Sequence, residues 1–347
     1  MSPSGLEQRR SEGLGLSVAM CTYNGATYLH EQLDSIIAQS RPADEIIICD
    51  DGSSDDTWPI LEKYWQRFPE VIRIYRNATN LGPAKNFGRA VGLCTKDFIA
   101  LGDQDDVWHP EKLKKLEERF IADSTLGLVF CNAERIDSTG NPLEGDLWQA
   151  VGFDARLKTA VKRGHGMQAL LQRSFVTGCT IMFRATLKEK CLPFVDSSVH
   201  DYWISLVSAA TSRIDFVDEK LVGYRQHRAN VIGAQNLSVK ERFDEACRLG
   251  VQGCIRDRDT IAELENRLSA LEESQLALVR QKRDYLRFRI ALWSKEVSRT
   301  RKAALIARNV AQGSYRRWSH PSWNPLVKDV LMVLGIVGKF SAFAGDH

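Results

Sequence analysis

The first hundred residues alternate short apolar runs with amphipathic stretches, and this alternation limits the fold more than any other feature of the chain. The apolar runs are LSVAMC, EIIIC, VIRIY and FIAL. The stretches between them, such as TYLHEQLDSIIAQS, place apolar residues three and four positions apart, as amphipathic helices do. Strands that alternate with helices of these lengths form βα units, so we predict a doubly wound α/β domain with a parallel sheet.

Each of these apolar runs ends in a polar cluster. The clusters are CTYN at 21–24, DDGSSDD at 50–56, NATNLG at 77–82 and DQDD at 103–106. Ligands of open α/β sheets bind beyond the carboxyl ends of the strands. We therefore expect the four clusters to meet at one rim of the sheet.

The cluster at 103–106 holds the carboxylates Asp103, Asp105 and Asp106. Three carboxylates so close together repel one another unless a cation lies between them. Mg²⁺ and Mn²⁺ accept such oxygen ligands and keep open positions for phosphate. The alternative is an acidic turn that caps the helix expected near Pro110, and the three residues alone leave both interpretations open.

Two other clusters suggest contacts with a nucleotide. Asp51 follows the second strand, and a carboxylate there can accept the imide N–H of uracil or thymine, a donor arrangement that adenine lacks. Lys85 in the segment NLGPAKNF could meet a phosphate as a point charge, and a solvated lysine at a helix start is the plainer alternative.

Four segments resemble, in order and spacing, glycosyltransferase family 2, the inverting enzymes with a GT-A fold. They are CTYNG at 21–25, CDDGSSDDT at 49–57, NLGPAKNF at 80–87 and DQDDVW at 103–108. Four later segments resemble the rhamnosyltransferase-type branch of this family. They are TGCT at 177–180, HD at 200–201, YRQH at 224–227 and NVIG at 230–233. The resemblance covers about residues 15–235. The expected fold class is α/β, a GT-A (Rossmann-like nucleotide-diphospho-sugar transferase) domain followed by a C-terminal α-helical extension.

The resemblance also implies site residues. Asp201 is expected to be the catalytic base, with capping of the following helix as the alternative role. The residues expected at the nucleotide are Thr22, Tyr23, Asn24, Asp51, Lys85 and Asp103. Those expected to hold Mg²⁺ or Mn²⁺ are Asp105, Asp103 and His227, and a plain hydrogen-bonding role is the alternative for His227. Those expected near the acceptor or sugar are Gly178, Trp203 and Asp106. Candidates for the diphosphate are Arg225 and Arg228.

The implied reaction moves a sugar, with inversion, from a nucleoside diphosphate to an acceptor hydroxyl. The favoured donor is dTDP-rhamnose, and the favoured acceptor is a lipid-linked or growing glycan of the bacterial surface. UDP-galactose, UDP-glucose and UDP-GlcNAc are alternative donors for the same chemistry. A non-catalytic subunit that binds nucleotide sugars in a polysaccharide assembly is the alternative from another functional class.

The C-terminal part differs from the rest in pattern and charge. We expect a tail at 1–14, the transferase domain at 15–235 and a basic helical region at 236–347. Between positions 280 and 318 there are twelve basic and two acidic side chains, although the whole chain carries a net charge of only +3. Five aromatic residues lie among them: Tyr285, Phe288, Trp293, Tyr315 and Trp318.

Basic helices with an aromatic face lie on anionic membranes. We therefore expect peripheral attachment to the cytoplasmic face of the inner membrane, with a helical hairpin that packs on protein as the alternative and no nucleic acid as a partner. The first residues carry no secretory signal, and the apolar stretch Val330 to Gly338 is too short to span a bilayer. The eight cysteines contain no CxxC pair, so we expect reduced thiols in the core of a cytoplasmic protein.

Overall fold

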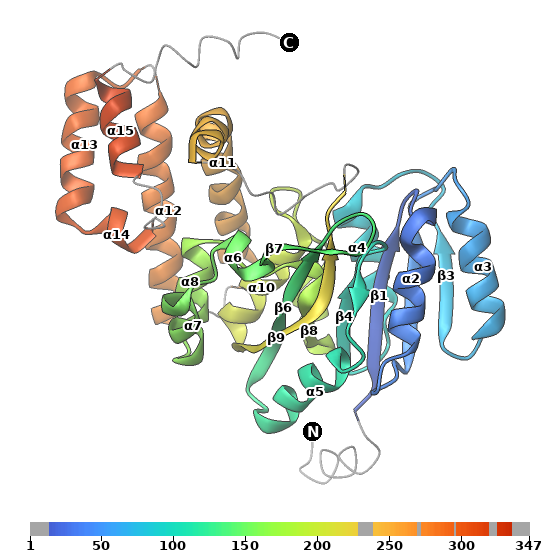
Figure 1. Cartoon of the computed structure of the whole chain (residues 1–347). Helices are drawn as coiled ribbons and strands as arrows, with labels where there is room; N and C mark the ends of the chain where they lie inside the picture. The colour runs from blue at the N-terminus through green and yellow to red at the C-terminus, as the bar shows by residue number, and fades with distance from the viewer. Residues whose placement is uncertain (1–13, 228–238, 269–271, 295, 319–324, 335–347) are drawn as a thin grey trace. The chain divides into compact units, whose positions relative to one another are not determined.

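The computed structural model describes residues 14–227, 239–268, 272–294, 296–318 and 325–334 (Figure 1). The chain divides into two compact units. The first comprises residues 1–166 and 175–234, and the second comprises residues 167–174 and 235–347. Most of the expected tail and the expected boundary at 235–236 lie outside the described residues.

A mixed sheet forms the centre of the first unit. Among the described residues its strand order is β3-β2-β1-β4-β8-β6-β9-β5, with β7 paired to β6. The strands β1 to β4 run parallel, whereas β8 is antiparallel to both of its neighbours, and β6 is parallel to β9. The strand bounds are β1 (Leu16–Thr22), β2 (Glu45–Asp50), β3 (Ile72–Arg76), β4 (Phe98–Gly102), β5 (Val107–Trp108), β6 (Leu126–Ile136), β7 (Pro142–Asp146), β8 (Ile181–Arg184) and β9 (Arg213–Arg225).

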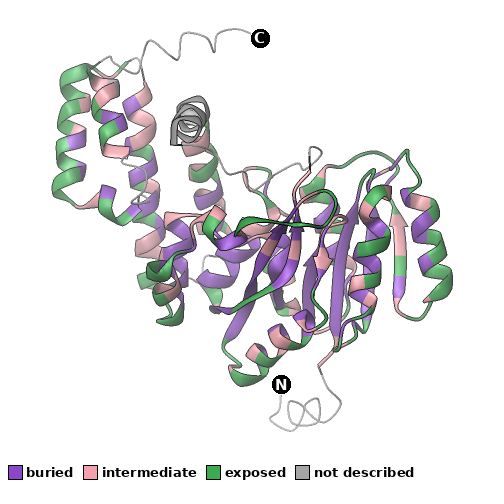
Figure 2. Ribbon diagram, viewed as in Figure 1, coloured by how far each residue is buried: buried purple, intermediate pink, exposed green. Residues whose placement is uncertain are grey.

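Every residue of β1, β2 and β4 is buried, as the purple ribbons of Figure 2 show. Parallel strands covered on both faces need continuous apolar runs rather than alternating ones. This burial explains why the sequence pattern was so clear in the first hundred residues.

The helices before residue 212 lie between these strands in the chain. The stripe Leu29, Leu33 and Ile36 of α2 is buried, and α4 begins with Pro83 after Gly82, whose φ of 80° favours glycine. The helix bounds before residue 212 are α2 (Ala26–Ile37), α3 (Thr57–Arg67), α4 (Pro83–Leu93), α5 (Lys112–Ala122), α6 (Leu147–Val151), α7 (Ala155–Lys162), α8 (Gly166–Gln172), α9 (Lys188–Cys191) and α10 (His200–Thr211). Two short 3₁₀ turns are η1 (Gly178–Thr180) and η2 (Ala185–Leu187).

The described part of the second unit is helical. Besides most of α8, its described helices are α11 (Val239–Arg267), α12 (Glu273–Trp293), α13 (Arg299–Ala311), α14 (Ser314–Trp318) and α15 (Pro325–Val333). Among the helices described, the length and the apolar character that a membrane span requires do not occur together.

The second unit buries aromatic side chains that were expected on a membrane-facing surface. Tyr285, Phe288, Tyr315 and Trp318 are each less than a tenth exposed. The Tyr315 ring lies 5.7 Å from that of Phe288 and 6.0 Å from that of Tyr285 between centroids. The expectation of an exposed aromatic face is therefore wrong for these four residues, because they build the core of the helical unit.

The predicted α/β class with a helical extension is confirmed. The short strands β5 and β7 were not predicted, since neither has an apolar run long enough to stand out. All seven described cysteines are free thiols, and six of them are buried, as expected of reduced cysteines in a core.

Candidate active site

The carboxyl ends of three parallel strands meet at one edge of the sheet. β1 lies between β2 and β4, and the register places Thr22 opposite Asp50 at the strand ends. The loops 23–25, 51–56 and 103–106 therefore begin side by side. This is the position at which open α/β sheets bind ligands.

Gln104 connects the loop after β1 to the loop of residues 103–106, which we call the acidic loop. The main-chain N–H of Tyr23 donates to Gln104 Oε1 over 2.7 Å, and Gln104 Nε2 donates to the Tyr23 carbonyl over 3.1 Å. A Cβ at Gly25 would lie 2.2 Å from Gln104 Oε1, so this contact requires glycine. Asn24 has a φ of 48°, and its Oδ1 accepts the N–H of Ser54. The loop is thus fixed from both sides, with Tyr23 about half exposed.

Asp51 is buried beneath the loop that follows β3. Its Oδ1 accepts hydrogen bonds from Asn77 Nδ2 over 2.6 Å and from the N–H of Leu81 over 2.8 Å. Its Oδ2 accepts the N–H of Gly82 over 2.9 Å. A carboxylate offers about four acceptor sites, so Oδ2 retains capacity for a further donor. Thr22, also buried, donates its hydroxyl to the last carboxylate of β2 over 3.0 Å.

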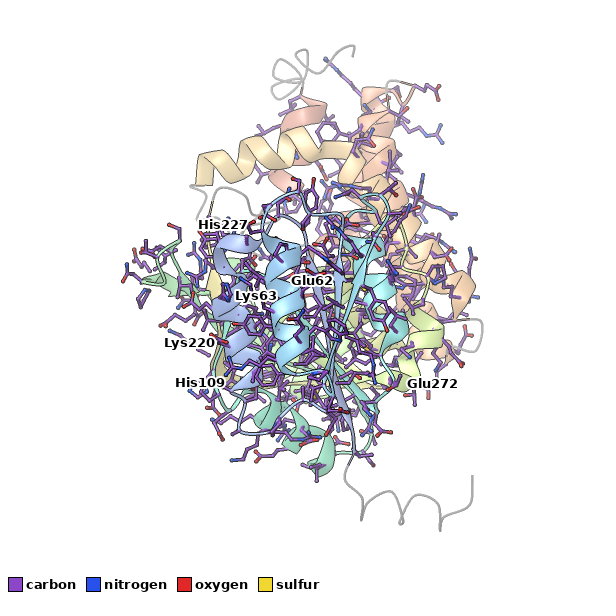
Figure 3. All side chains as sticks on the ribbon, turned by 90° about the vertical axis from the view of Figure 1, so that its right-hand side faces the viewer. Glu62, Lys63, His109, Lys220, His227 and Glu272 are labelled. Carbon is purple, nitrogen blue, oxygen red and sulfur yellow. The ribbon has the colours of Figure 1, made fainter. Side chains whose placement is uncertain are left out.

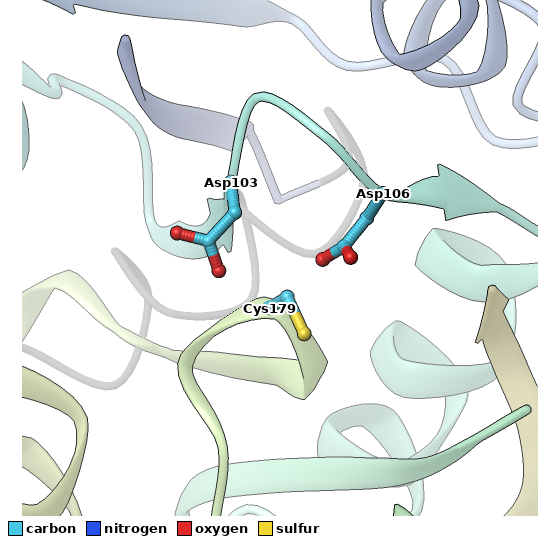
Figure 4. Close-up of side chains that lie close together, drawn as sticks. All are labelled: Asp103, Asp106 and Cys179. Atoms are coloured by element: carbon cyan, nitrogen blue, oxygen red, sulfur yellow. The ribbon is translucent and has the colours of Figure 1, made fainter. Parts of the chain in front are cut away.

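The acidic loop after β4 turns two carboxylates toward Cys179 (Figure 4). A carboxylate oxygen of Asp103, one of Asp106 and Cys179 Sγ, the atoms that could bind a metal ion, lie within 4.8 Å of one another. Asp106 is 1% exposed, and its Oδ1 accepts the main-chain N–H of Arg225 over 3.1 Å. Its Oδ2 is buried and has no hydrogen-bond partner among the described residues. A buried oxygen without a donor costs about 1–3 kcal/mol, so this position favours a cation.

Burial and mutual repulsion raise the pKa of these carboxyl groups. Burial raises the pKa of Asp103 well above its usual value, and the charges of Asp106, Asp105 and Asp201 raise it further. The pKa of Asp106 is raised to about 7, first by burial and then by Asp105. The buried ammonium of Lys112 opposes the shift at both residues. The carboxylates of separate segments therefore share one electrostatic environment, which a divalent cation would stabilise.

Asp105 pairs with His227, which follows the last strand of the sheet. The distance between Asp105 Oδ2 and His227 Nε2 is 2.8 Å. The imidazole lies beside α2 (Figure 3), where its centroid is 4.9 Å from that of the Tyr28 ring. The structure thus joins two of the residues predicted to hold a metal, although 122 positions separate them in the chain.

This donor set fits the hard cations Mg²⁺ and Mn²⁺. Carboxylate oxygens from Asp103, Asp105 and Asp106 suit such ions, and Mn²⁺ also accepts imidazole. Cys179 does not suit Mg²⁺ or Mn²⁺, because thiolates select softer metals. Burial also raises the pKa of this thiol well above its usual value, which favours the protonated form over the thiolate that binds metals.

Asp201 lies in the first turn of α10 and reaches back to the η1 turn. Its Oδ2 accepts the N–H of Gly178 over 3.0 Å, and its Oδ1 accepts the N–H of Tyr202 over 2.6 Å. The second bond satisfies one of the free N–H groups at the helix start, so a contribution to the helix terminus is present. The first bond orients the carboxylate beside the turn that carries Cys179.

Comparison with known proteins identifies the family to which the chain belongs. Residues 17–189 match the family described as Glycosyl transferase family 2. The chain is 30% identical over 263 residues to the dTDP-rhamnosyl transferase RfbG of Shigella flexneri, an alignment that covers 72% of this chain and 84% of the relative. The chain belongs to glycosyltransferase family 2.

Solved structures agree on the fold of this glycosyltransferase. S. aureus TarS 1–349 in complex with UDP-GlcNAc matches with a TM-score of 0.52 at 18% identity, covering 93% of this chain and 92% of TarS 1–349. The mannosyltransferase PcManGT from Pyrobaculum calidifontis in complex with GDP-Man and Mn²⁺ matches with a TM-score of 0.51 at 16% identity, covering 96% of this chain and 88% of that one. The shared fold is GT-A.

The structure bears on the roles predicted for Trp203 and Lys85 of the glycosyltransferase. Trp203 was expected to contact a sugar, but it is fully buried and its indole N–H donates to the Cys191 carbonyl over 2.9 Å. That prediction is wrong, because the ring fills the core behind α10. Lys85 is 64% exposed, and its Nζ lies 3.9 Å from Asp196 Oδ1, so a contact of Lys85 with a phosphate stays a prediction.

The structure also gives the surroundings of further predicted residues. Asp106, expected near the sugar, lies buried in the acidic cluster, and Gly178 lies against Asp201 with a main-chain contact only. Arg225 was considered for the diphosphate but is 1% exposed. Arg228 and the NVIG segment at 230–233 lie outside the described residues.

Sequence reasoning missed residues that hold the acidic loop in place. Gln32 is fully buried on α2, and its Nε2 donates to the carbonyl of Asp103 over 2.7 Å. A glutamine within the apolar stripe of a helix was a usable signal, because buried polar side chains require partners. Gln104 was noted only as a member of the acidic motif.

Proposed function

We propose that this glycosyltransferase moves L-rhamnose from dTDP-rhamnose, with inversion, to a hydroxyl of a lipid-linked or growing surface glycan. The observation that carries the proposal is the convergence of Asp51, the acidic loop with His227, and Asp201 at one rim of the sheet. The 30% identity to a dTDP-rhamnosyl transferase supports the choice of donor.

Each residue has a chemical task in the proposed reaction. The carboxylate of Asp51 accepts the imide N–H of thymine. Asp105, Asp103 and His227 would hold a divalent cation, which would supply positive charge beside the departing diphosphate. Asp201 accepts the proton of the acceptor hydroxyl while the hydroxyl oxygen bonds to the anomeric carbon from the face opposite the diphosphate. In the same displacement the bond between the anomeric carbon and the diphosphate oxygen breaks, and dTDP departs with the electron pair.

A donor screen tests the proposal. Purified protein with Mn²⁺ or Mg²⁺ is given dTDP-, UDP- and GDP-sugars, and release of the nucleotide is measured with and without EDTA. We expect the fastest release from dTDP-rhamnose, and its loss in EDTA. Faster release from UDP-galactose, UDP-glucose or UDP-GlcNAc would reassign the donor, and binding without turnover of any donor would favour the non-catalytic subunit.

We also propose that the second unit attaches the enzyme to the cytoplasmic face of the inner membrane by charge. Arg299, Arg301, Arg308 and Arg316 are exposed, and none pairs with a carboxylate among the described residues. Basic residues near an anionic surface contribute about 1 kcal/mol each. Attachment of this kind needs no aromatic insertion, so it is compatible with the buried rings of this unit.

Reversing two of these charges should weaken vesicle binding. We expect the double variant Arg301→Glu, Arg308→Glu to bind vesicles containing anionic phosphatidylglycerol at least about tenfold less well in a flotation assay. The matched control reverses Lys63 and Arg67, which are exposed on α3. Equal flotation of the wild type and the double variant would contradict attachment through α13.

A further inference from the structure

Arg225 ends β9 beside the acidic loop and is almost completely buried. Its Nε donates to the carbonyl of Asp105 over 2.8 Å, and Nη1 donates to the carbonyl of Asp137 over 3.3 Å. Nη2 pairs with Glu31 on α2. One guanidinium group therefore connects the acidic loop, the turn after β6 and the helix that follows β1.

Arg225 and His227 contact the same aromatic ring of α2. Residues two apart in an extended chain face the same side, so Arg225 and His227 both face α2. The N–H of Gln226 donates to the Ile136 carbonyl over 2.8 Å and continues the pairing of β9 with β6 up to this point. The Tyr28 ring then contacts both side chains, with its centroid 4.7 Å from Arg225 Cζ and 4.9 Å from the imidazole centroid.

The main chain of Arg225 adds a further link. Its N–H donates to Asp106 Oδ1 over 3.1 Å, while its side chain fixes the carbonyl of Asp105. Two neighbouring residues of the acidic loop are thus held by one residue. A lysine could not reproduce this arrangement, because an ammonium lacks the planar fork of donors that reaches three acceptors in fixed directions.

We propose that Arg225 is a positioning residue for the divalent cation, and that it acts by fixing Asp105 against His227. This inference rests on the metal dependence in the proposed function. Arg225 itself touches neither donor nor cation in this assignment. Partners that orient metal ligands typically change metal affinity by about 10- to 100-fold when they are removed.

The test is a double-mutant cycle on the full-length protein. Binding of Mn²⁺ is followed by the electron paramagnetic resonance signal of the free ion, first without and then with dTDP. We expect Arg225→Lys to weaken Mn²⁺ binding by about tenfold or more, and His227→Ala to weaken it as well. In the double variant the effect of Arg225→Lys should fall to about twofold or less, because groups that act through one another are not additive.

Arg184→Lys is the matched control. Arg184 also donates to a main-chain carbonyl, that of Leu126, and lies over the Phe98 ring, but it sits at the opposite ends of the strands. Its replacement should leave Mn²⁺ binding unchanged. Arg225→Lys with wild-type affinity, or a fully additive cycle, would overturn the inference while leaving the proposed function intact. A wild-type protein that binds no Mn²⁺ would contradict metal dependence and the inference together.

A second variant covers the case in which Arg225→Lys does not fold. Tyr28 lies at the surface of α2 and is only partly buried, so Tyr28→Leu removes the ring between Arg225 and His227 without opening the core. We expect Tyr28→Leu to fold with a normal circular dichroism spectrum and to weaken Mn²⁺ binding by about threefold or more. Unchanged affinity in this folded variant would overturn the positioning role.

Discussion

Asp201→Asn should lower the rate of sugar transfer by about 10²-fold or more and leave donor binding unchanged. The amide of asparagine does not take the proton from the acceptor hydroxyl. It keeps one oxygen that can accept the N–H of Gly178, so the η1 turn should retain its place. Turnover measured at saturating donor, together with donor affinity from calorimetry, separates these two effects.

Asp218→Asn is the control for this experiment. Asp218 lies on β9, is about 59% exposed and pairs with Lys158, away from the rim. Its replacement should change neither turnover nor donor affinity. Near-normal turnover of Asp201→Asn would show that the carboxylate serves only the start of α10, which its bond to Tyr202 already supports.

Asp105→Asn should abolish nucleotide binding that depends on a divalent cation. Loss of an orienting partner alone weakens metal sites by about 10- to 100-fold, so loss of a ligand should exceed about 10²-fold. The asparagine side chain can still form a hydrogen bond to His227, so we expect the loop to remain folded. Calorimetric titration with dTDP in Mn²⁺ and in EDTA measures the difference.

In the Asp105→Asn experiment, binding of dTDP in EDTA serves as the internal control. It should be weak and equal in the wild type and the variant, because the contacts of Asp51 and the loop after β1 remain. Undiminished Mn²⁺-dependent binding by the variant would show that the cation lies elsewhere, with Asp103 and the buried Asp106 as the next candidates.

The sheet could be predicted from sequence because its central strands are buried on both faces. Val18 in β1, Ile47 in β2 and Ile99 in β4 belong to short, continuous apolar runs, which are typical of strands in a covered parallel sheet. β7 has the pattern PLEGD, with four exposed residues, and carries no such signal. Strands of this kind at the edge of a sheet are fixed by their neighbours more than by their own composition.

The site was predictable where residues lie close together in the chain, and less so where distant segments meet. The motif at 103–106 indicated its own chemistry, whereas the pairing of Asp105 with His227 was expected only through the family resemblance. Trp203 was misplaced because a tryptophan beside the proposed base Asp201 suggests a sugar platform, and nothing local shows which side of α10 faces the core. Arg225 was a candidate for the diphosphate, and its burial could not be predicted because burial of an arginine depends on acceptors supplied by three other segments.

The proposed mechanism depends on carboxylates from separate βα units meeting around one cation that holds a nucleotide diphosphate. A crystal structure with Mn²⁺ and dTDP, with anomalous scattering recorded at the manganese edge, tests this directly. We predict one strong anomalous peak between Asp105, His227 and the diphosphate, with thymine at Asp51. A peak remote from Asp105, or thymine bound away from the ends of β1 and β2, would contradict it.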